Sequence, residues 1–279
     1  MKKFVISIVG VLFILFLFLF WGGKVYTKYS IKSEIADLKS QVDFKRKKYF
    51  NYSLIEVQPK IIQKFFRAVI DDSSQIPNFI TLNQSGNIKT EENSNWLNIK
   101  SIEYFTAQKP NLLWDAEIGN SKFFWIEIVD SYLKNKGNTL IKINSSITIG
   151  DSWGIEIDKS NLFKYLSEAV YFPTSLLPSK NLIWNILDSN SAEVKFTDKN
   201  TSLVAKIFFN TNGTIKKIET LDKFRPMNNN YKESLFTIYF FDYKKHSSFL
   251  IPTYCEVEWE LEKGKFKFGK FKIDSIKYE

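Results

Sequence analysis

The sequence predicts a mainly β protein of the α+β class: a large curved antiparallel sheet of about ten strands with two helices packed on it, preceded by one N-terminal transmembrane helix. Three observations support this class. Many short segments alternate apolar and polar residues, with turn-forming residues closely spaced between them. No helix–strand alternation of the parallel kind appears. Aromatic residues make up 16% of the chain, enough to fill a substantial core.

The N-terminal segment is predicted to cross a membrane. Lys2 and Lys3 precede an uncharged apolar run from Phe4 to Trp21, which at about 1.5 Å per residue approaches the roughly 30 Å thickness of the hydrocarbon core. The run ends in bulky residues, so an uncleaved signal anchor is expected rather than a cleaved signal peptide. Lysines flank both of its ends, and the short first flank favours an internal amino terminus. We therefore expect a single-pass protein of the cell membrane with its C-terminal domain outside the cytoplasm.

The 279 residues are predicted to fall into three parts. Residues 1–23 form the transmembrane signal anchor, 24–50 a juxtamembrane helix or stalk, and 51–279 a single antiparallel β domain. In the second part, Ile31 and Leu38 belong to an apolar stripe at helical spacing, which indicates that the anchor helix continues into it.

Two helices are predicted inside the domain. Residues 59–70 begin with a proline and place apolar side chains three and four positions apart, which is typical of an amphipathic helix. The second helix is expected from Asn161 to Tyr171, with Ser160 as its N-terminal cap and Pro173 beyond its end.

Strands are predicted in the segments that alternate apolar and polar residues. They cover Phe79 to Gln84, Asn98 to Gln108, Leu112 to Ile118, Lys122 to Tyr132, Thr139 to Ile149, Ala192 to Thr197, Ser202 to Phe209, Thr214 to Thr220 and Ser234 to Tyr243. A hairpin closes the chain, with Lys263 and Gly264 at its turn, Trp259 opposite Phe268, and a bulge at Gly269.

The composition argues against several functional classes. The net charge is +9, but lysines are spread along the chain and arginines are few, so no nucleic-acid partner is predicted. The alternative to a lysine-rich background is contact with anionic lipid headgroups. The chain has one histidine, His246, and one cysteine, Cys255, and it lacks a glycine-rich phosphate loop, so no metal and no cofactor are predicted.

Paired carboxylates are the main basis for considering an enzyme. Asp115 and Glu117 share one face of a predicted strand, as a glycosidase-like pair would, and a solvated strand face is the alternative. Glu168 and Asp130 are the other candidates for acid–base chemistry. No catalytic residue is assigned.

The stretch KYLSEAVYFPTSLLPS, Lys164 to Ser179, resembles the signature of an uncharacterised bacterial family known only as a domain of unknown function. Further fragments fit it in order: Gln63 to Ile70, Phe105 to Gln108, Leu112 to Ala116, Val129 to Leu133, Asn190 to Asp198 and Ile251 to Leu261. The resemblance implies that Lys164, Glu168 and Asp130 are its polar signature residues. The family commonly has arginine and tryptophan where this chain has Lys164 and Tyr171.

The predicted layout is also similar to the half-barrel of the lipoprotein carriers LolA and LolB, which implies an apolar cavity between the sheet and the helices. The candidate lining residues, for which ordinary core packing is the alternative, are Trp114, Trp125, Phe172, Leu176, Leu177 and Trp259. The leading hypothesis is a membrane-anchored, non-catalytic binding or carrier module for a lipid or other apolar ligand at the cell envelope. The alternatives are a structural module that binds an envelope protein, and an enzyme with paired carboxylates.

Overall fold

A computed structural model describes residues 2–121, 123–227 and 230–279, with the backbone alone for residues 2–9, 11–20 and 227. Its main element is a 13-stranded sheet in which every neighbouring pair is antiparallel. In spatial order its strands are β8 (Ile147–Ser152), β7 (Lys136–Ile143), β6 (Ile126–Leu133), β5 (Asn111–Ile118), β4 (Leu97–Thr106), β3 (Phe79–Ile88), β17 (Gly264–Tyr278), β16 (Phe249–Leu261), β15 (Phe236–His246), β12 (Ile215–Thr220), β11 (Thr201–Phe209), β10 (Ser191–Asp198) and β9 (Leu182–Ile186). The last strand of the domain thus pairs with the first long one, β17 with β3.

The mainly β class with a large antiparallel sheet is confirmed, but the predicted number of about ten strands is too low. One reason is that the segment Thr139 to Ile149 forms two strands. Asn144 and Ser145 adopt positive φ angles of 52° and 62°, which turn the chain between β7 and β8. The other reason is the short strand β9, whose sequence LIWNI begins with three apolar residues in a row and so lacks the apolar–polar alternation of a predicted strand. Two small hairpin sheets complete the β structure: β1 (Lys48–Tyr49) with β2 (Gln75–Ile76), and β13 (Phe224–Met227) with β14 (Asn230–Glu233).

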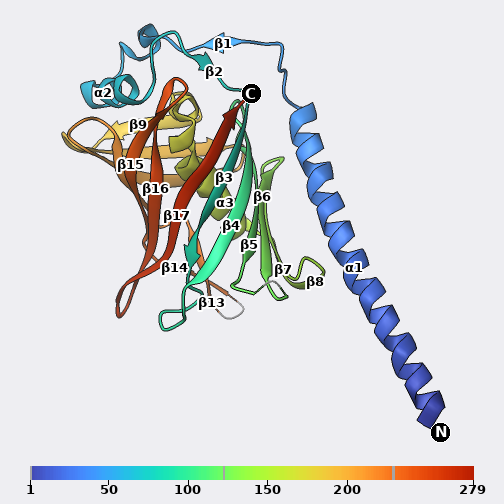
Figure 1. The fold of residues 1–279 in the computed structure, drawn as a ribbon. Helices are drawn as coiled ribbons and strands as arrows, with labels where there is room; N and C mark the ends of the chain where they lie inside the picture. The colour runs from blue at the N-terminus through green and yellow to red at the C-terminus, as the bar shows by residue number, and fades with distance from the viewer. Residues whose placement is uncertain (1, 122, 228–229) are drawn as a thin grey trace.

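Three α-helices occur in the described chain: α1 (Lys2–Ser40), α2 (Lys60–Val69) and α3 (Ile155–Glu168). The sheet curves around α3, while α2 lies near one end of the strands (Figure 1). Short 3-10 helices, η1 (Tyr52–Ile55), η2 (Ala169–Tyr171) and η3 (Pro173–Leu176), flank them in the chain. The core fills the space between the sheet and α3 with buried aliphatic and aromatic side chains.

Helix α3 begins at Ile155, six residues before the predicted start at Asn161, because Gly154 with a φ of 124° breaks the preceding strand. Asp158 in its first turn accepts a hydrogen bond of 2.6 Å from the Gly137 amide and fixes this end to β7. The predicted cap, Ser160, instead lies inside the helix and accepts a hydrogen bond from the Phe224 amide. This contact ties the start of β13 to α3.

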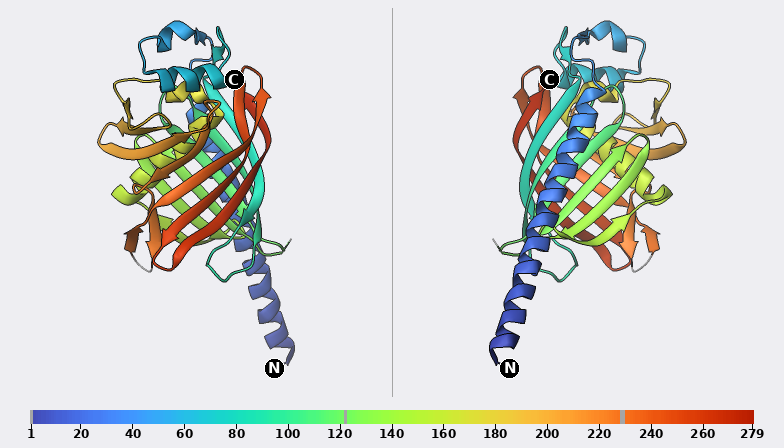
Figure 2. Two further views of the ribbon diagram at one scale, coloured as in Figure 1. Left: turned by 90° about the vertical axis from the view of Figure 1, so that its left-hand side faces the viewer. Right: turned by 90° about the vertical axis from the view of Figure 1, so that its right-hand side faces the viewer.

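Helix α1 packs on the convex face of the sheet and extends beyond it towards the amino terminus (Figure 2). Its Ile31 and Leu38 form a second apolar cluster with Phe79, Leu113 and Val129. Within the residues described, no helix combines the length and the apolar character needed to cross a bilayer. Most side chains of the predicted anchor, positions 4–9 and 11–20, lie outside the described part, so the anchor stays a prediction.

The C-terminal hairpin forms with a different register from the one predicted. Trp259 pairs with Phe266 instead of Phe268. The predicted bulge forms beside Gly269: Val257 pairs with Gly269 and Glu258 with Lys267, so Phe268 is the extra residue on β17. The turn falls one step earlier than expected because Gly264 takes up a φ of 119° directly after the two loop residues and pairs with Leu261.

Candidate functional site

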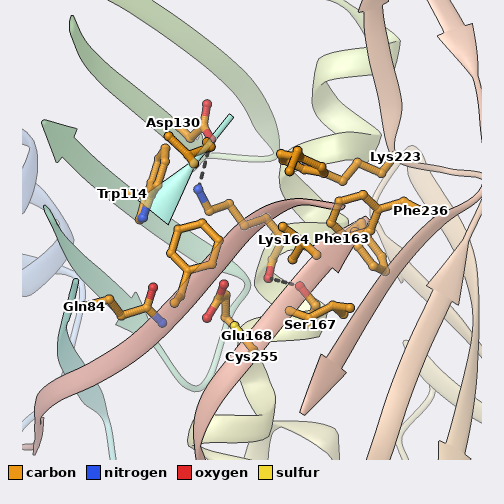
Figure 3. Close-up of a pocket in the computed structure, with 15 residues that line it drawn as sticks. Gln84, Trp114, Asp130, Phe163, Lys164, Ser167, Glu168, Lys223, Phe236 and Cys255 are labelled. Carbon is orange, nitrogen blue, oxygen red and sulfur yellow. Dashed lines mark hydrogen bonds and ion pairs between the residues drawn. The ribbon is translucent and has the colours of Figure 1, made fainter. Parts of the chain in front are cut away.

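A cavity of about 170 Å³ lies between α3 and the concave face of the sheet. Its wall combines charged groups with aliphatic and aromatic side chains (Figure 3). The lining residues are Gln84, Ile88, Trp114, Asp130, Phe163, Lys164, Ser167, Glu168, Lys223, Phe236, Ile238, Cys255, Val257, Phe268 and Phe271. The three residues predicted as polar signature positions, Lys164, Glu168 and Asp130, all belong to this lining.

The register of four strands aligns polar and aromatic side chains beneath α3. Glu103 on β4 pairs with Trp114 on β5, Trp114 with Asp130 on β6, and Asp130 with Thr139 on β7. Paired residues of an antiparallel sheet point to the same face, so these four form one row across the sheet. The charged side chains of α3 pack against this row.

Lys164 connects α3 to this row. Its Nζ lies 3.0 Å from Asp130 Oδ2 and 3.2 Å from the centre of the Trp114 ring, a cation–π contact (Figure 3). Thr139 donates a hydrogen bond of 2.7 Å to the other oxygen of Asp130. Burial opposes ionisation of Asp130, but the positive charges of Lys164 and Lys223 outweigh it and lower its pKa. Lys164 and Asp130 are therefore an ionised pair.

Two further carboxyl groups favour their neutral forms. Burial is the main cause that raises the pKa of Glu168 to about 7, against the opposing effect of Lys164 and Lys223. Burial, followed by the charge of Glu168, raises the pKa of Glu103 well above its ordinary range. Among the described residues, neither carboxyl oxygen of Glu103 has a hydrogen-bond partner. The same holds for Oε2 of Glu168. Protonated carboxyl groups of this kind can donate a hydrogen bond to a ligand.

Lys223 brings a second positive charge to the cavity from the loop before β13. Lys159 pairs with Asp222 at 2.8 Å on one side of it, and Phe224 donates to Ser160 at 2.9 Å on the other. Its Nζ lies 5.3 Å from the Phe236 ring and makes no hydrogen bond or ion pair with any described residue. Burial, followed by the charge of Lys164, lowers its pKa to about 8 against the opposing charges of Asp130 and Glu168.

The opposite wall of the cavity is apolar and comes mainly from the C-terminal strands. Phe236, Val257 and Phe268 are among its side chains. Trp259 lies behind this wall, where its ring contacts those of Phe236 and Phe268 at 4.9 and 6.1 Å between centres. The cavity thus has one charged side and one apolar side.

The predicted apolar lining residues are divided between the cavity and other places. Trp114 lines the cavity, whereas Phe172 packs against Phe105 and Tyr165 in the core. Trp125 lies away from the cavity and contacts Lys24 of α1. The other two belong to the core, Leu176 fully buried and Leu177 packed against it. That any of these residues binds a ligand remains a prediction.

The structure adds Glu103 and Lys223 to the residues singled out in the sequence. A signal for Glu103 was present, because it shares the parity of the buried Ile99 and Phe105 on β4 and is a charged residue at an inward position. Lys223 lies in a loop without periodicity, so only its tertiary contacts bring it to the cavity.

The other predicted carboxylate pair lies on the opposite face of the sheet. Asp115 and Glu117 point to the convex side, where Glu127 pairs with Glu117 across the strands. Burial, followed by the charges of Glu127 and Glu117, raises the pKa of Asp115 to about 7, while Lys28 of α1 acts in the opposite direction. Among the described residues, no group of three or more His, Cys, Asp or Glu side chains is arranged to hold a metal ion.

Comparison with known proteins identifies a family and a fold resemblance. A family of unknown function, DUF6920, matches residues 56–278. No curated protein matches the chain significantly.

Three solved structures resemble the fold at low sequence identity. A LolA superfamily protein from Nitrosomonas europaea has 9% identity and a TM-score of 0.39, over 78% of this chain and 92% of its own. A putative outer membrane lipoprotein-sorting protein domain from Vibrio parahaemolyticus has 12% identity and a TM-score of 0.40, over 72% and 86%. A DUF1329 family protein from Desulfovibrio piger has 10% identity and a TM-score of 0.41, over 82% and 91%.

Proposed function

Because the chain belongs to DUF6920, a family of unknown function, its own cavity has to indicate its role, and we propose that it binds an amphiphilic ligand with an acyl chain. In this proposal the protein is a non-catalytic binding or carrier module, tethered to the cell membrane by α1. The charged and apolar sides of one cavity are the observation that carries it. Ligand sites are mostly apolar and contain a few convergent polar groups that fix the orientation of the ligand.

The volume of the cavity limits what it can enclose. A dry cavity of about 150 Å³ accommodates a benzene-sized group. The cavity of about 170 Å³ is therefore suited to the polar end of a ligand with the first carbons of its chain, while the rest of the chain remains outside. A complete two-chain lipid would not fit.

The tether is supported by apolar groups at the end of the domain from which α1 projects. The predicted anchor ends at Trp21, and three residues later Lys24 lies 4.5 Å from the centre of the Trp125 ring. In the same loop, Phe123 and Phe124 are 89% and 54% exposed. Exposed aromatic side chains next to an apolar helix are suited to the interfacial region of a bilayer.

Ligand binding can be tested on the full-length chain in mild non-ionic detergent by native mass spectrometry and solvent extraction. We expect a co-purified acyl compound at about one per chain, and its loss in Ser167→Phe, which places a ring in the cavity from α3. Ser189→Phe, at an exposed position in a loop, is the matched control and should retain the compound. An empty mass for the unmodified chain after exposure to membranes would contradict the proposal.

The membrane orientation needs a separate test. A cysteine at Ser189 in a Cys255→Ser background provides a single exposed thiol. A membrane-impermeant maleimide should label it on intact cells as fully as after permeabilisation if the domain lies outside the cytoplasm. Labelling only after permeabilisation would place the domain inside.

An acid–base enzyme is the second candidate, and one observation favours it. Glu168 and Lys223 line the same cavity with pKa values of about 7 and 8, which suit proton transfer near neutral pH. Turnover of an acyl ester by the purified chain, lost in Glu168→Gln, would favour this candidate. Binding of the ester without turnover would favour the carrier.

A further inference from the structure

The charged side chains around the cavity do not balance, and the excess positive charge is that of Lys223. Lys164 and Asp130 neutralise each other at 3.0 Å. Lys223 has no such partner in the described chain: its Nζ lies 5.3 Å from the centre of the Phe236 ring, and Asp130 and Glu168 act on it only from beyond ion-pair distance. Lys223 is half-buried, and an ammonium group that has lost part of its hydration without gaining a counter-ion favours an external negative charge.

The two carboxyl groups of the cavity that act on Lys223, Asp130 and Glu168, do not balance its charge, because Asp130 is paired with Lys164 at 3.0 Å. Glu168 and the adjacent Glu103 are shifted towards their neutral forms by burial. Both carboxyl oxygens of Glu103 and Oε2 of Glu168 have no hydrogen-bond partner among the described residues. When it is protonated, each of these carboxyl groups can donate a hydrogen bond. The cavity therefore presents one uncompensated cation next to a neutral donor, with an apolar wall opposite.

We propose that the ligand is a single-chain amphiphile whose polar end is a carboxylate, and that Lys223 pairs with this carboxylate while Glu168 donates a hydrogen bond to it. The inference rests on the proposed function, because it names the polar end of the acyl ligand.

Charge and size both select a carboxylate over other headgroups. A carboxylate carries one negative charge, which matches the single uncompensated cation. A phosphate monoester carries between one and two charges at neutral pH and would leave excess negative charge in a buried space. An amine would add a second uncompensated cation beside Lys223. The small cavity has room for a carboxylate with the first carbons of one chain.

The test compares four ligands with the same chain: palmitate, hexadecanol, hexadecylamine and hexadecyl phosphate. Binding is measured for the full-length protein in nanodiscs, with empty nanodiscs subtracted. Palmitate should bind more tightly than the other three. Lys223→Met should weaken palmitate binding about 10- to 100-fold, the loss expected for a charge-assisted hydrogen bond, and leave hexadecanol binding unchanged.

Two variants serve as controls. Lys223→Arg keeps the charge and should retain most of the palmitate affinity. Lys232→Met removes a lysine that pairs with Glu262 on the surface and should change neither ligand. Lys223→Met itself should fold, because it replaces an unpaired charge with an apolar group of similar length.

The outcomes separate this inference from the proposed function. If palmitate and hexadecanol bind equally well, and Lys223→Met changes neither, acyl binding stands and the carboxylate assignment is wrong. Preferred binding of hexadecyl phosphate or hexadecylamine would likewise overturn the assignment. If no member of the series binds, both the inference and the proposed function fail.

Discussion

Lys164 of α3 and Asp130 of β6 form an ion pair of 3.0 Å in which both side chains are nearly withdrawn from water, 12% and 14% exposed. The pair joins the helix to the sheet at the edge of the cavity, and the Trp114 ring covers the ammonium group. Its two members depend on each other, because either charge alone would remain buried without compensation. The free energies of unfolding of variants at these two positions therefore report whether the two side chains are paired.

We expect Lys164→Met and Asp130→Asn to destabilise the fold by about 3 kcal/mol each, because each leaves one buried charge or polar group without its partner. The double variant should recover much of this loss. Chemical unfolding of the detergent-solubilised chain would measure the free energies. Lys232→Met, at an exposed ion pair, is the control and should leave the unfolding midpoint unchanged. Single-variant effects below about 1 kcal/mol would mean that water screens the pair.

The buried carboxyl groups predict how stability depends on pH. The pKa of Glu168 is raised from 4.5 in its ordinary environment to about 7 in the fold, so the folded state binds its proton more tightly than the unfolded state. Its contribution to stability is complete below pH 4.5 and is lost as the pH rises through 7. Glu103 acts in the same direction. Lys223, with a pKa of about 8, changes charge only above this window.

Glu168→Gln should therefore flatten the fall in unfolding free energy between pH 4.5 and 7, by up to about 3 kcal/mol. Denaturant titrations at several pH values would measure the two curves. Glu262→Gln is the matched control, because Glu262 is exposed and its pKa is lowered by Lys232, so it acts only at more acidic pH. Parallel curves for Glu168→Gln and the unmodified chain would show that Glu168 is hydrated.

The position of α3 depends on a close approach at Gly137. A Cβ atom at this glycine of β7 would lie 2.5 Å from the Ile157 carbonyl oxygen and 2.9 Å from the Asp158 Cα. Gly137→Ala should therefore push the first turn of α3 away from the sheet and destabilise the fold by about 1–3 kcal/mol. Gly150→Ala on β8 is the control, since its Cβ would meet only the Ile141 side chain at 3.4 Å. Equal unfolding midpoints for the two variants would contradict the close packing of α3 on β7.

Local patterns in the sequence are sufficient to predict most elements of this fold. The first helix of the domain is expected at 59–70 and forms at Lys60–Val69, because an apolar stripe and a starting proline are both local signals. The start of α3 is missed because Ser160 has the character of a cap, whereas Gly154 with its positive φ ends the preceding strand earlier. The pairing of β17 with β3 joins distant parts of the chain, and no local signal encodes it.

The site is less accessible to sequence reasoning than the fold. Lys164, Glu168 and Asp130 follow from the family signature, and the inward position of Glu103 follows from strand parity. The position of Lys223 depends on contacts of its loop with α3, and that of Trp125 on the packing of α1 against the convex face. Both are tertiary contacts between segments that are far apart in the chain.

The attachment of α1 to the sheet can be tested at Leu38. This side chain is 1% exposed and packs in the apolar cluster with Phe79 and Leu113 on the convex face. Leu38→Ala should remove about 2–5 kcal/mol of packing energy from this contact, so the end of α1 should separate from the sheet more often. Hydrogen exchange of residues 31–40 should accelerate, while exchange in β10 and β11 stays unchanged. Val25→Ala, at an exposed position of the same helix, is the control. If both variants exchange at the rate of the unmodified chain, α1 is not held by this cluster.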